Sequence, residues 1–399
     1  MGFSPPPITR QPQNASYRAQ NAHAQASEGE RAVQAKQCGQ CIPSEACRNA
    51  VFDWAQRNGR SFPASALGLK RLSVELDELL RCRSPSEEAL IIDVGAGIHN
   101  LGEEWIFKVR SLHNDDSDAL WLLGSFGPWA RIHAFEANKV KAVELQKAAR
   151  LRRRTTGFSE QLVVHSMGVG GENRVANLAE CTAYPNAWSI TGNRGTAANS
   201  RLNCKTGHEI NVTTLDDFVD RLPGGPAAPL YIKIDVEGGE WDVLRGMRKL
   251  LTERRVAVAS FEYAVGWHPA FKKRVLTDTD RDDVIQSGAT LQRFQRELST
   301  YGYDTYLVNA GKRNSGVVLV PVYGAFWRDE LEICFNRSRW YFERCWNDLI
   351  VVRRCDTCVK QVLFGDTLRR THETFASAPG RVKEWKPPLV PGGGVCECL

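Results

Sequence analysis

The chain has 399 residues and a formal net charge of +6, and 42% of its residues are hydrophobic, which is ordinary for a globular protein with a large core. It contains no run of the roughly 20 apolar residues that a membrane span needs, no apolar N-terminal signal core and no clustered basic patch that would favour nucleic acid. We therefore expect a cytoplasmic protein that binds neither membranes nor nucleic acids.

The twelve cysteines leave the redox state open. Two CxxC pairs, Cys38 with Cys41 and Cys355 with Cys358, have a spacing that suits zinc thiolates. Pairs so far apart in the sequence meet only if the two ends of the chain pack together, so we prefer unlinked thiols to disulfides or zinc. Glycosylation sequons begin at Asn14, Asn211 and Asn336. They matter only if the protein enters a secretory compartment.

The first part of the chain divides into three segments by composition. Residues 1–42 are polar, Pro-rich and then Ala- and Gln-rich, and we expect them to be disordered. Residues 43–88 carry apolar residues at helical spacing, which predicts a helical lead-in. Residues 89–97 (ALIIDVGAG) predict a buried strand that ends in a glycine turn.

Strands alternate with helices over residues 89–325. Strands are predicted at 89–94, 130–136, 161–169, 230–236 and 256–263, with a closing strand pair at 305–308 and 316–320. Helices are predicted at 101–112, 139–154, 215–222, 240–251 and 290–301, with an insertion at 113–129 and hairpins or loops at 170–212. The pattern predicts an α/β domain with a Rossmann-like, doubly wound, mostly parallel seven-stranded sheet and helices on both faces. Residues 326–399 are expected to form a C-terminal extension, helical at first and then a loose tail.

Three carboxylates come at predicted strand ends: Asp93, Glu136 and Asp235. Ligands of open α/β sheets bind outside the carboxyl ends of the strands. A glycine turn backed by one carboxylate, with a second carboxylate one strand away, suits a nucleoside whose ribose hydroxyls need acceptors. The turn is not the dinucleotide fingerprint, because the third glycine of G-x-G-x-x-G is missing after Gly95 and Gly97.

Four motifs carry a resemblance to a known family: 91–97 (IIDVGAG), 133–138 (HAFEAN), 212–218 (VTTLDDF) and, most specific, 231–246 (YIKIDVEGGEWDVLRG). The chain resembles the FkbM-family methyltransferases, which have the class I S-adenosylmethionine-dependent fold, over roughly residues 89–320. The resemblance implies S-adenosylmethionine as the cofactor and a hydroxyl of a small molecule or glycan as the methyl acceptor. The cofactor-binding residues that it implies are Asp93, Gly95, Ala96, Gly97, Glu136, Ala137 and Asp235.

The same resemblance places Asp235 and Glu237 on the reaction side of the pocket. Transfer to a hydroxyl is helped by a base near the methyl group, and our candidates are Glu237, His268 and Asp235. Simpler roles stay open, since Glu237 could cap the next helix and His268 could be a structural loop residue. Lys233 alternates to the face of Asp235 and could pair with it or be solvated.

Two further questions stay open at the level of sequence. Asp235 and Glu237 could ligate Mg²⁺, but two carboxylates are weak evidence and we predict no metal site. The altered turn over residues 97–102 favours an alternative function, a catalytically silent binding or scaffold protein with this fold. The oligomeric state is not predicted.

Overall fold

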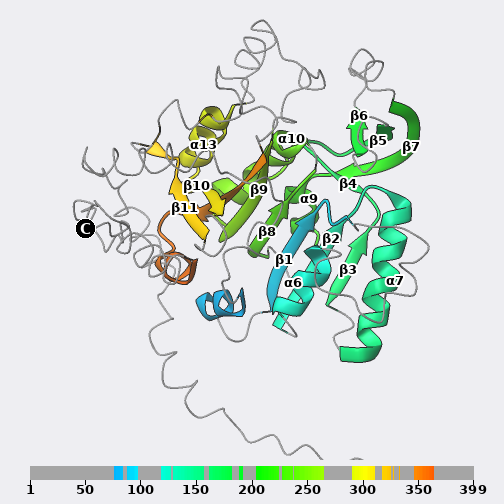
Figure 1. Ribbon diagram of the computed structural model, residues 1–399, viewed down its shortest axis with the longest axis horizontal. Coiled ribbons are helices and arrows are strands. Elements are labelled where there is room, and N and C mark those ends of the chain that lie inside the picture. The colour runs from blue at the N-terminus through cyan, green and yellow to red at the C-terminus, as the bar shows by residue number, and fades with distance from the viewer. Residues whose placement is uncertain are drawn as a thin grey trace, which may run out of the picture.

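The structure is a computed structural model that describes residues 76–83, 88–97, 118–126, 129–156, 161–181, 188–191, 204–223, 227–236, 238–264, 290–310, 317–324, 327, 332 and 346–363 (Figure 1). The helices are η2 (Leu76–Cys82, a 3-10 helix), α6 (Asp118–Phe126), α7 (Lys139–Thr156), α9 (Leu215–Asp220), α10 (Glu240–Arg245), α11 (Arg248–Thr252) and α13 (Leu291–Thr300). The strands are β1 (Ala89–Val94), β2 (Ala130–Phe135), β3 (Leu162–His165), β4 (Gly168–Val169), β5 (Arg174–Cys181), β6 (Trp188–Thr191), β7 (Cys204–Thr213), β8 (Pro229–Ile234), β9 (Val258–Ala264), β10 (Tyr303–Ala310), β11 (Val317–Pro321) and β12 (Trp346–Arg353). Residues 357–363 form one more short helix.

The main sheet has the strand order β11-β10-β12-β9-β8-β1-β2-β3. The five strands from β9 to β3 run parallel, and β12, β10 and β11 continue the sheet with antiparallel pairings. This confirms the predicted Rossmann-like, mostly parallel α/β fold. The described sheet has eight strands rather than the predicted seven, because β12, which was not predicted as a strand, joins the expected pair β10 and β11.

Strand β1 lies at the centre of the parallel part and is buried on both faces. Leu90, Ile92 and Val94 belong to one core, and Ala89 and Ile91 belong to the other. All six residues of the strand are buried, as expected for a strand covered by helices on both sides. Its apolar run from Ala89 to Ile92 is therefore what a central parallel strand requires.

Helices cover both faces of this sheet. Apolar residues of α9, α10, α11 and α13 pack into the first core, and apolar residues of η2, α6, α7 and the helix at 357–363 pack into the second. Figure 1 shows the arrangement of these helices around the sheet. The predicted helices on both faces are thus confirmed. Helix α6 packs on β2 and lies inside the segment expected to be an insertion, whereas the helix expected at 101–112 lies outside the described residues.

Strand β12 corrects the expected closure of the sheet. It runs antiparallel between β9 and β10, where the pair 305–308 and 316–320 was expected to complete the sheet. Leu349, Ile350, Val351 and Val352 are fully buried in it, so the sheet continues well past residue 325. Most of the aromatic-rich segment expected to be helical, and all residues after 363, lie outside the described residues.

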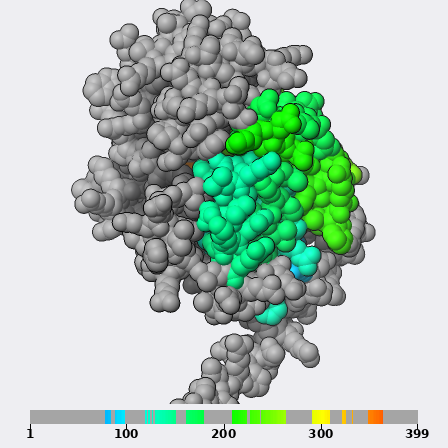
Figure 2. All heavy atoms as spheres, turned by 90° about the vertical axis from the view of Figure 1, so that its right-hand side faces the viewer, coloured from blue at the N-terminus to red at the C-terminus, as the bar shows by residue number. Residues whose placement is uncertain are grey.

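A smaller sheet has the strand order β4-β7-β5-β6. Its strands β5, β6 and β7 come largely from residues 170–212, which were expected to form hairpins or loops. The single strand predicted at 161–169 is two strands, β3 in the main sheet and β4 in the small one, so the chain changes sheets at Ser166 and Met167. Ala176, Leu178, Ile210 and Val212 form the core of this sheet. Strands of the small sheet and helix α7 are both exposed on the face shown in Figure 2.

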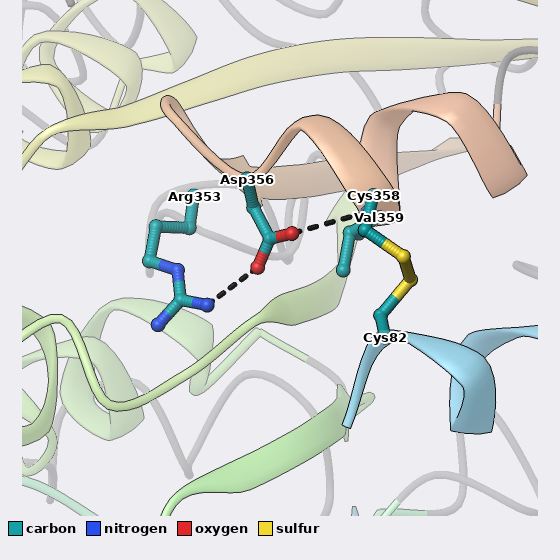
Figure 3. The surroundings of a disulfide bond; sticks show 5 residues. All are labelled: Cys82, Arg353, Asp356, Cys358 and Val359. Atoms are coloured by element: carbon teal, nitrogen blue, oxygen red, sulfur yellow. Dashed lines mark hydrogen bonds and ion pairs between the residues drawn. A yellow bond between two sulfur atoms is a disulfide. The ribbon is translucent and has the colours of Figure 1, made fainter. Parts of the chain in front are cut away.

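A disulfide joins Cys82 of η2 to Cys358 of the helix at 357–363, across 276 residues of sequence (Figure 3). Asp356 caps the N-terminus of this helix, where its side chain accepts a hydrogen bond from the Val359 amide at 3.1 Å. It also forms an ion pair with Arg353 (Figure 3). Cys355 is disulfide-bonded as well. The preference for unlinked thiols is therefore wrong for these three cysteines, because the two ends of the domain do pack together. A zinc site that uses Cys355 and Cys358 is also wrong.

The termini otherwise yield little structural detail. The segment 1–42 and most of the expected lead-in lie outside the described residues, and η2 is the part of that lead-in that the structure places. Leu79 of η2 is fully buried against the second core, as a helical lead-in that covers the sheet would be. Within the described ranges, no helix is long and apolar enough to cross a bilayer.

Candidate active site

The turn after β1 is held between its two neighbouring strands. The amides of Gly95 and Ala96 both donate to the carbonyl oxygen of Phe135 at 3.0 Å, and the Asp235 amide donates to the Val94 carbonyl at 3.0 Å. Gly95 has φ +80°, and a Cβ on it would lie 1.7 Å from the Asp235 carbonyl oxygen. Only glycine fits this position, because both the backbone conformation and the close approach exclude a side chain.

Gly97 fills a different need. A Cβ there would lie 3.8 Å from Oε2 of Glu136, which is an ordinary van der Waals distance. Among the described residues there is therefore room for a side chain at this position. A glycine here adds no atoms between the backbone and the Glu136 carboxylate.

Glu136 follows β2 directly and is 7% exposed. Its Oε1 accepts a hydrogen bond from the Asn138 amide at 2.7 Å, and Asn138 Oδ1 in turn accepts from the Val140 amide at 2.9 Å at the start of α7. Burial raises the pKa of the Glu136 carboxyl, while the Asn138 amide and the charges of Lys141 and Lys233 oppose that rise. The result is a fixed carboxylate with its second oxygen turned toward Gly97.

Three charged side chains lie close together near the carboxyl ends of β1 and β8. Lys233 Nζ lies 3.6 Å from Oδ1 of the fully buried Asp93 and 3.3 Å from Oδ2 of Asp235. Of the two alternatives left open for Lys233, the structure shows the pairing with Asp235. The Asp235 side chain is 24% exposed, whereas that of Asp93 is completely covered. The Asp93 side chain is thus buried under the glycine turn, whereas the Asp235 side chain is partly exposed to solvent.

Glu240, the first residue of α10, was not singled out from the sequence. It is fully buried, and its Oε1 accepts hydrogen bonds from the amides of Val236 at 3.0 Å and Gly238 at 3.3 Å. Burial, with the nearby charge of Asp235 adding to it, raises the pKa of Glu240 to about 8. The sequence signal was present, since two glycines precede a helix-starting glutamate in the most specific motif, but nothing local indicates burial.

A histidine pair on β2 and β3, on the face of the sheet that α9 covers, was also missed. His133 Nδ1 and His165 Nε2 are 2.9 Å apart, and both rings pack against Phe218 of α9. Burial lowers the pKa of His133 to about 4, with His165 and Arg131 adding to the effect, and burial also lowers the pKa of His165. Both rings are therefore neutral at pH 7 and belong to the core beneath the site.

The structure brings together most of the residues predicted to bind the cofactor: Asp93, Gly95, Ala96, Gly97, Glu136 and Asp235. Ala137 is partly buried and packs against the core of the small sheet. Two of the candidate bases, Glu237 and His268, lie outside the described residues. Only Asp235 of those three can be placed.

These residues fit a nucleoside cofactor. A ribose presents hydroxyl donors, and Glu136 offers a fixed acceptor beside the bare backbone of Gly97. A turn that no Cβ fills at Gly95 lets the backbone come close to a ligand at the carboxyl ends of the strands. Gly95, Gly97 and Glu136 are the residues that would hold the group.

Comparisons with solved structures give matches of low similarity. A methyltransferase FkbM from Methylobacillus flagellatus KT has 16% identity and a TM-score of 0.33, over 84% of this chain and 60% of that one. A putative caffeoyl-CoA O-methyltransferase from Staphylococcus aureus has 11% identity and a TM-score of 0.29, over 77% and 91% of the two chains. A putative O-methyltransferase from Klebsiella pneumoniae has 13% identity and a TM-score of 0.27, over 81% and 96%. A search of curated proteins finds no match.

The family assignment rests on a family model. The model described as "Methyltransferase FkbM domain" matches residues 93–299, which is just over half of the chain. The match begins at Asp93 of the turn and spans Glu136, Asp235 and Glu240. The chain belongs to the FkbM family of S-adenosylmethionine-dependent methyltransferases.

Proposed function

We propose that this methyltransferase transfers the methyl group to a hydroxyl oxygen of a small molecule or a glycan. S-adenosylmethionine supplies an already activated sulfonium methyl group, so the protein mainly has to align an acceptor and exclude water. Glu136 would accept hydrogen bonds from the ribose hydroxyls, and the turn at Gly95 and Gly97 would let the backbone approach the cofactor. These roles are supported by the burial of Glu136 and by the steric requirement at Gly95.

The observation that carries the oxygen acceptor is the position of Asp235. Its side chain is 24% exposed at this edge of the sheet, and the ammonium group of Lys233 lies 3.3 Å from its Oδ2. A carboxylate at the open side of the site is suited to take the proton of an attacking hydroxyl. Glu237 and His268 stay predictions for the same role.

The test is a transfer assay with S-adenosylmethionine labelled in its methyl group. The full chain is incubated with a panel of sugars, polyols and phenols, and the position of the methyl group is read by mass spectrometry and NMR. We expect an O-methyl product, and Asp235→Asn should lower kcat for its formation. Transfer to nitrogen acceptors alone would overturn the proposal, and cofactor binding without any transfer would favour the silent binding protein.

We also propose that the chain folds in an oxidising compartment, in place of the cytoplasm that the sequence suggested. The Cys82–Cys358 bond and the bonded state of Cys355 support this, since disulfides are rare where glutathione keeps thiols reduced. Alkylation of the natural protein without prior reduction should leave Cys82 and Cys358 unmodified. Alkylation of these two cysteines would instead place the protein in a reducing compartment.

A further inference from the structure

Three carboxylates from separate elements converge beside the proposed cofactor site. Asp235 follows β8, Glu240 begins α10, and Glu262 lies on β9, the neighbouring strand. One oxygen from each lies within 4.8 Å of the other two. Such convergence is costly, because Glu240 is fully buried, Glu262 is 4% exposed, and carboxylates held close together outside water disfavour one another's ionised form.

Glu240 supplies an independent sign of a missing partner. Its Oε1 is engaged by the amides of Val236 and Gly238. Its Oε2 is buried and has no hydrogen-bond partner in the part of the chain that the structure describes. A buried oxygen with unused lone pairs is expensive, and native proteins rarely leave one without a ligand, a proton or a water.

The ammonium group of Lys233 lies at the edge of this cluster. Its Nζ is 3.3 Å from Asp235 Oδ2 and 3.6 Å from Oδ1 of Asp93, and of these two carboxylates only Asp235 belongs to the cluster. The pairing with Lys233 uses one oxygen of Asp235, and a carboxylate has two oxygens that can bind a cation.

The chemistry of the donors limits what that cation can be. All three donors are carboxylate oxygens, with no histidine or cysteine among them, which suits Ca²⁺, Mg²⁺ or Mn²⁺ rather than zinc or copper. Two Ca²⁺–oxygen bonds of about 2.3–2.6 Å can span up to roughly 5 Å, whereas two Mg²⁺–oxygen bonds span little more than about 4 Å. Oxygens spread over as much as 4.8 Å therefore accommodate the larger ions without movement.

We propose that Asp235, Glu240 and Glu262 bind a divalent cation of the size of Ca²⁺ or Mn²⁺. The site differs from the Asp235–Glu237 pair considered on sequence grounds, because its second and third ligands come from α10 and β9. It lies at the carboxyl ends of β8 and β9, the edge at which the acceptor is proposed to bind. A cation held there would bind the acceptor hydroxyl and lower its pKa. This use, unlike the binding itself, rests on the proposed function.

The test is Mn²⁺ binding to the full chain in the absence of S-adenosylmethionine. The protein is stripped with EDTA and titrated with Mn²⁺, and free Mn²⁺ is followed by electron paramagnetic resonance while calorimetry gives the stoichiometry. We expect one ion per chain, displaced by Ca²⁺, with Asp235→Asn and Glu262→Gln each weakening the affinity at least about tenfold. Asp242→Asn is the matched control, since it removes a carboxylate from α10 that pairs with Arg245 outside the cluster.

Thermal melts protect the test from variants that fail to fold. Mn²⁺ should raise the melting temperature of wild type and of Asp242→Asn, but not that of Glu262→Gln. Wild type that binds no Mn²⁺ up to about 1 mM, the weak end of protein Ca²⁺ sites, would overturn the proposal and leave Glu240 as a protonated buried acid. Binding that the Asp235 and Glu262 variants retain in full would place the ion elsewhere. Neither result affects the methyltransferase proposal, because cofactor binding is measured separately.

Discussion

The disulfide between Cys82 and Cys358 should contribute strongly to stability. It closes a loop with a sequence separation of 276 residues, for which the chain-entropy relation gives about 5–6 kcal/mol at 25 °C. That figure is an upper limit, because measured disulfides often contribute less than the chain-entropy relation gives. We expect the Cys82→Ala/Cys358→Ala double variant to lose about 2–4 kcal/mol of unfolding free energy.

The assay is equilibrium unfolding in guanidinium chloride without reducing agent. The midpoint of the double variant should fall, and its m-value should rise, because an unfolded chain without the cross-link exposes more surface. Each single variant, with its remaining thiol blocked, serves as the control. Since either substitution breaks the same bond, each single loss should equal the double loss rather than half of it.

Two results would refute this account of the disulfide. A double variant with the wild-type midpoint would show that the bond contributes nothing measurable. Single losses that add up to the double loss would show that the packing of the two side chains, rather than the cross-link, carries the effect. Cys82 does pack against the second core, so the comparison is needed.

Three further predictions address the turn, the buried histidine and a buried ion pair. Gly95→Ala should destabilise the fold by about 2–4 kcal/mol, because the new Cβ clashes with the Asp235 carbonyl oxygen and the backbone has a positive φ. Gly97→Ala should cost under about 1 kcal/mol. Thermal melts compare the two variants, and equal losses of stability would contradict the steric argument. The pKa of His133 is about 4 in the folded protein, whereas its ordinary value is 6.5. As the pH falls, His133 therefore takes up a proton in the unfolded chain at a higher pH than in the folded protein. Unfolding free energy should then drop by up to about 3 kcal/mol between pH 6.5 and pH 4, and His133→Phe should flatten that slope; an unchanged slope would contradict the assignment. Asp304→Asn should cost about 3–5 kcal/mol in urea unfolding, because Asp304 is 3% exposed and pairs with Arg354 at 2.8 Å; a loss below about 1 kcal/mol would show that the pair is effectively solvated.

The sequence allowed prediction of features that depend on neighbouring residues. Short apolar runs, together with the glycines or charged residues that end them, predict strand β1, its glycine turn and the acidic residue after β2. The pairing of Lys233 with Asp235 follows from alternation along one strand. These are the features on which the proposed cofactor site rests.

Features that depend on long-range packing could not be predicted in the same way. Strand β12 is apolar enough to be a strand, but its insertion between β9 and β10 is a matter of topology that no local pattern encodes. The partner of Cys82 lies 276 residues away, and connectivity among many cysteines cannot be deduced from spacing. The burial of Glu240 depends on how α10 packs over β8 and β9, so its role was visible only in three dimensions.

The central claim is that Glu136 holds the cofactor at the turn after β1. Calorimetric titration of S-adenosylmethionine into wild type, Glu136→Gln and the exposed control Glu172→Gln tests it most directly. The account predicts a Kd for Glu136→Gln about 10- to 100-fold weaker than wild type, the loss expected for hydrogen bonds to a charged acceptor, and an unchanged Kd for Glu172→Gln. Wild-type affinity in a folded Glu136→Gln variant would contradict it.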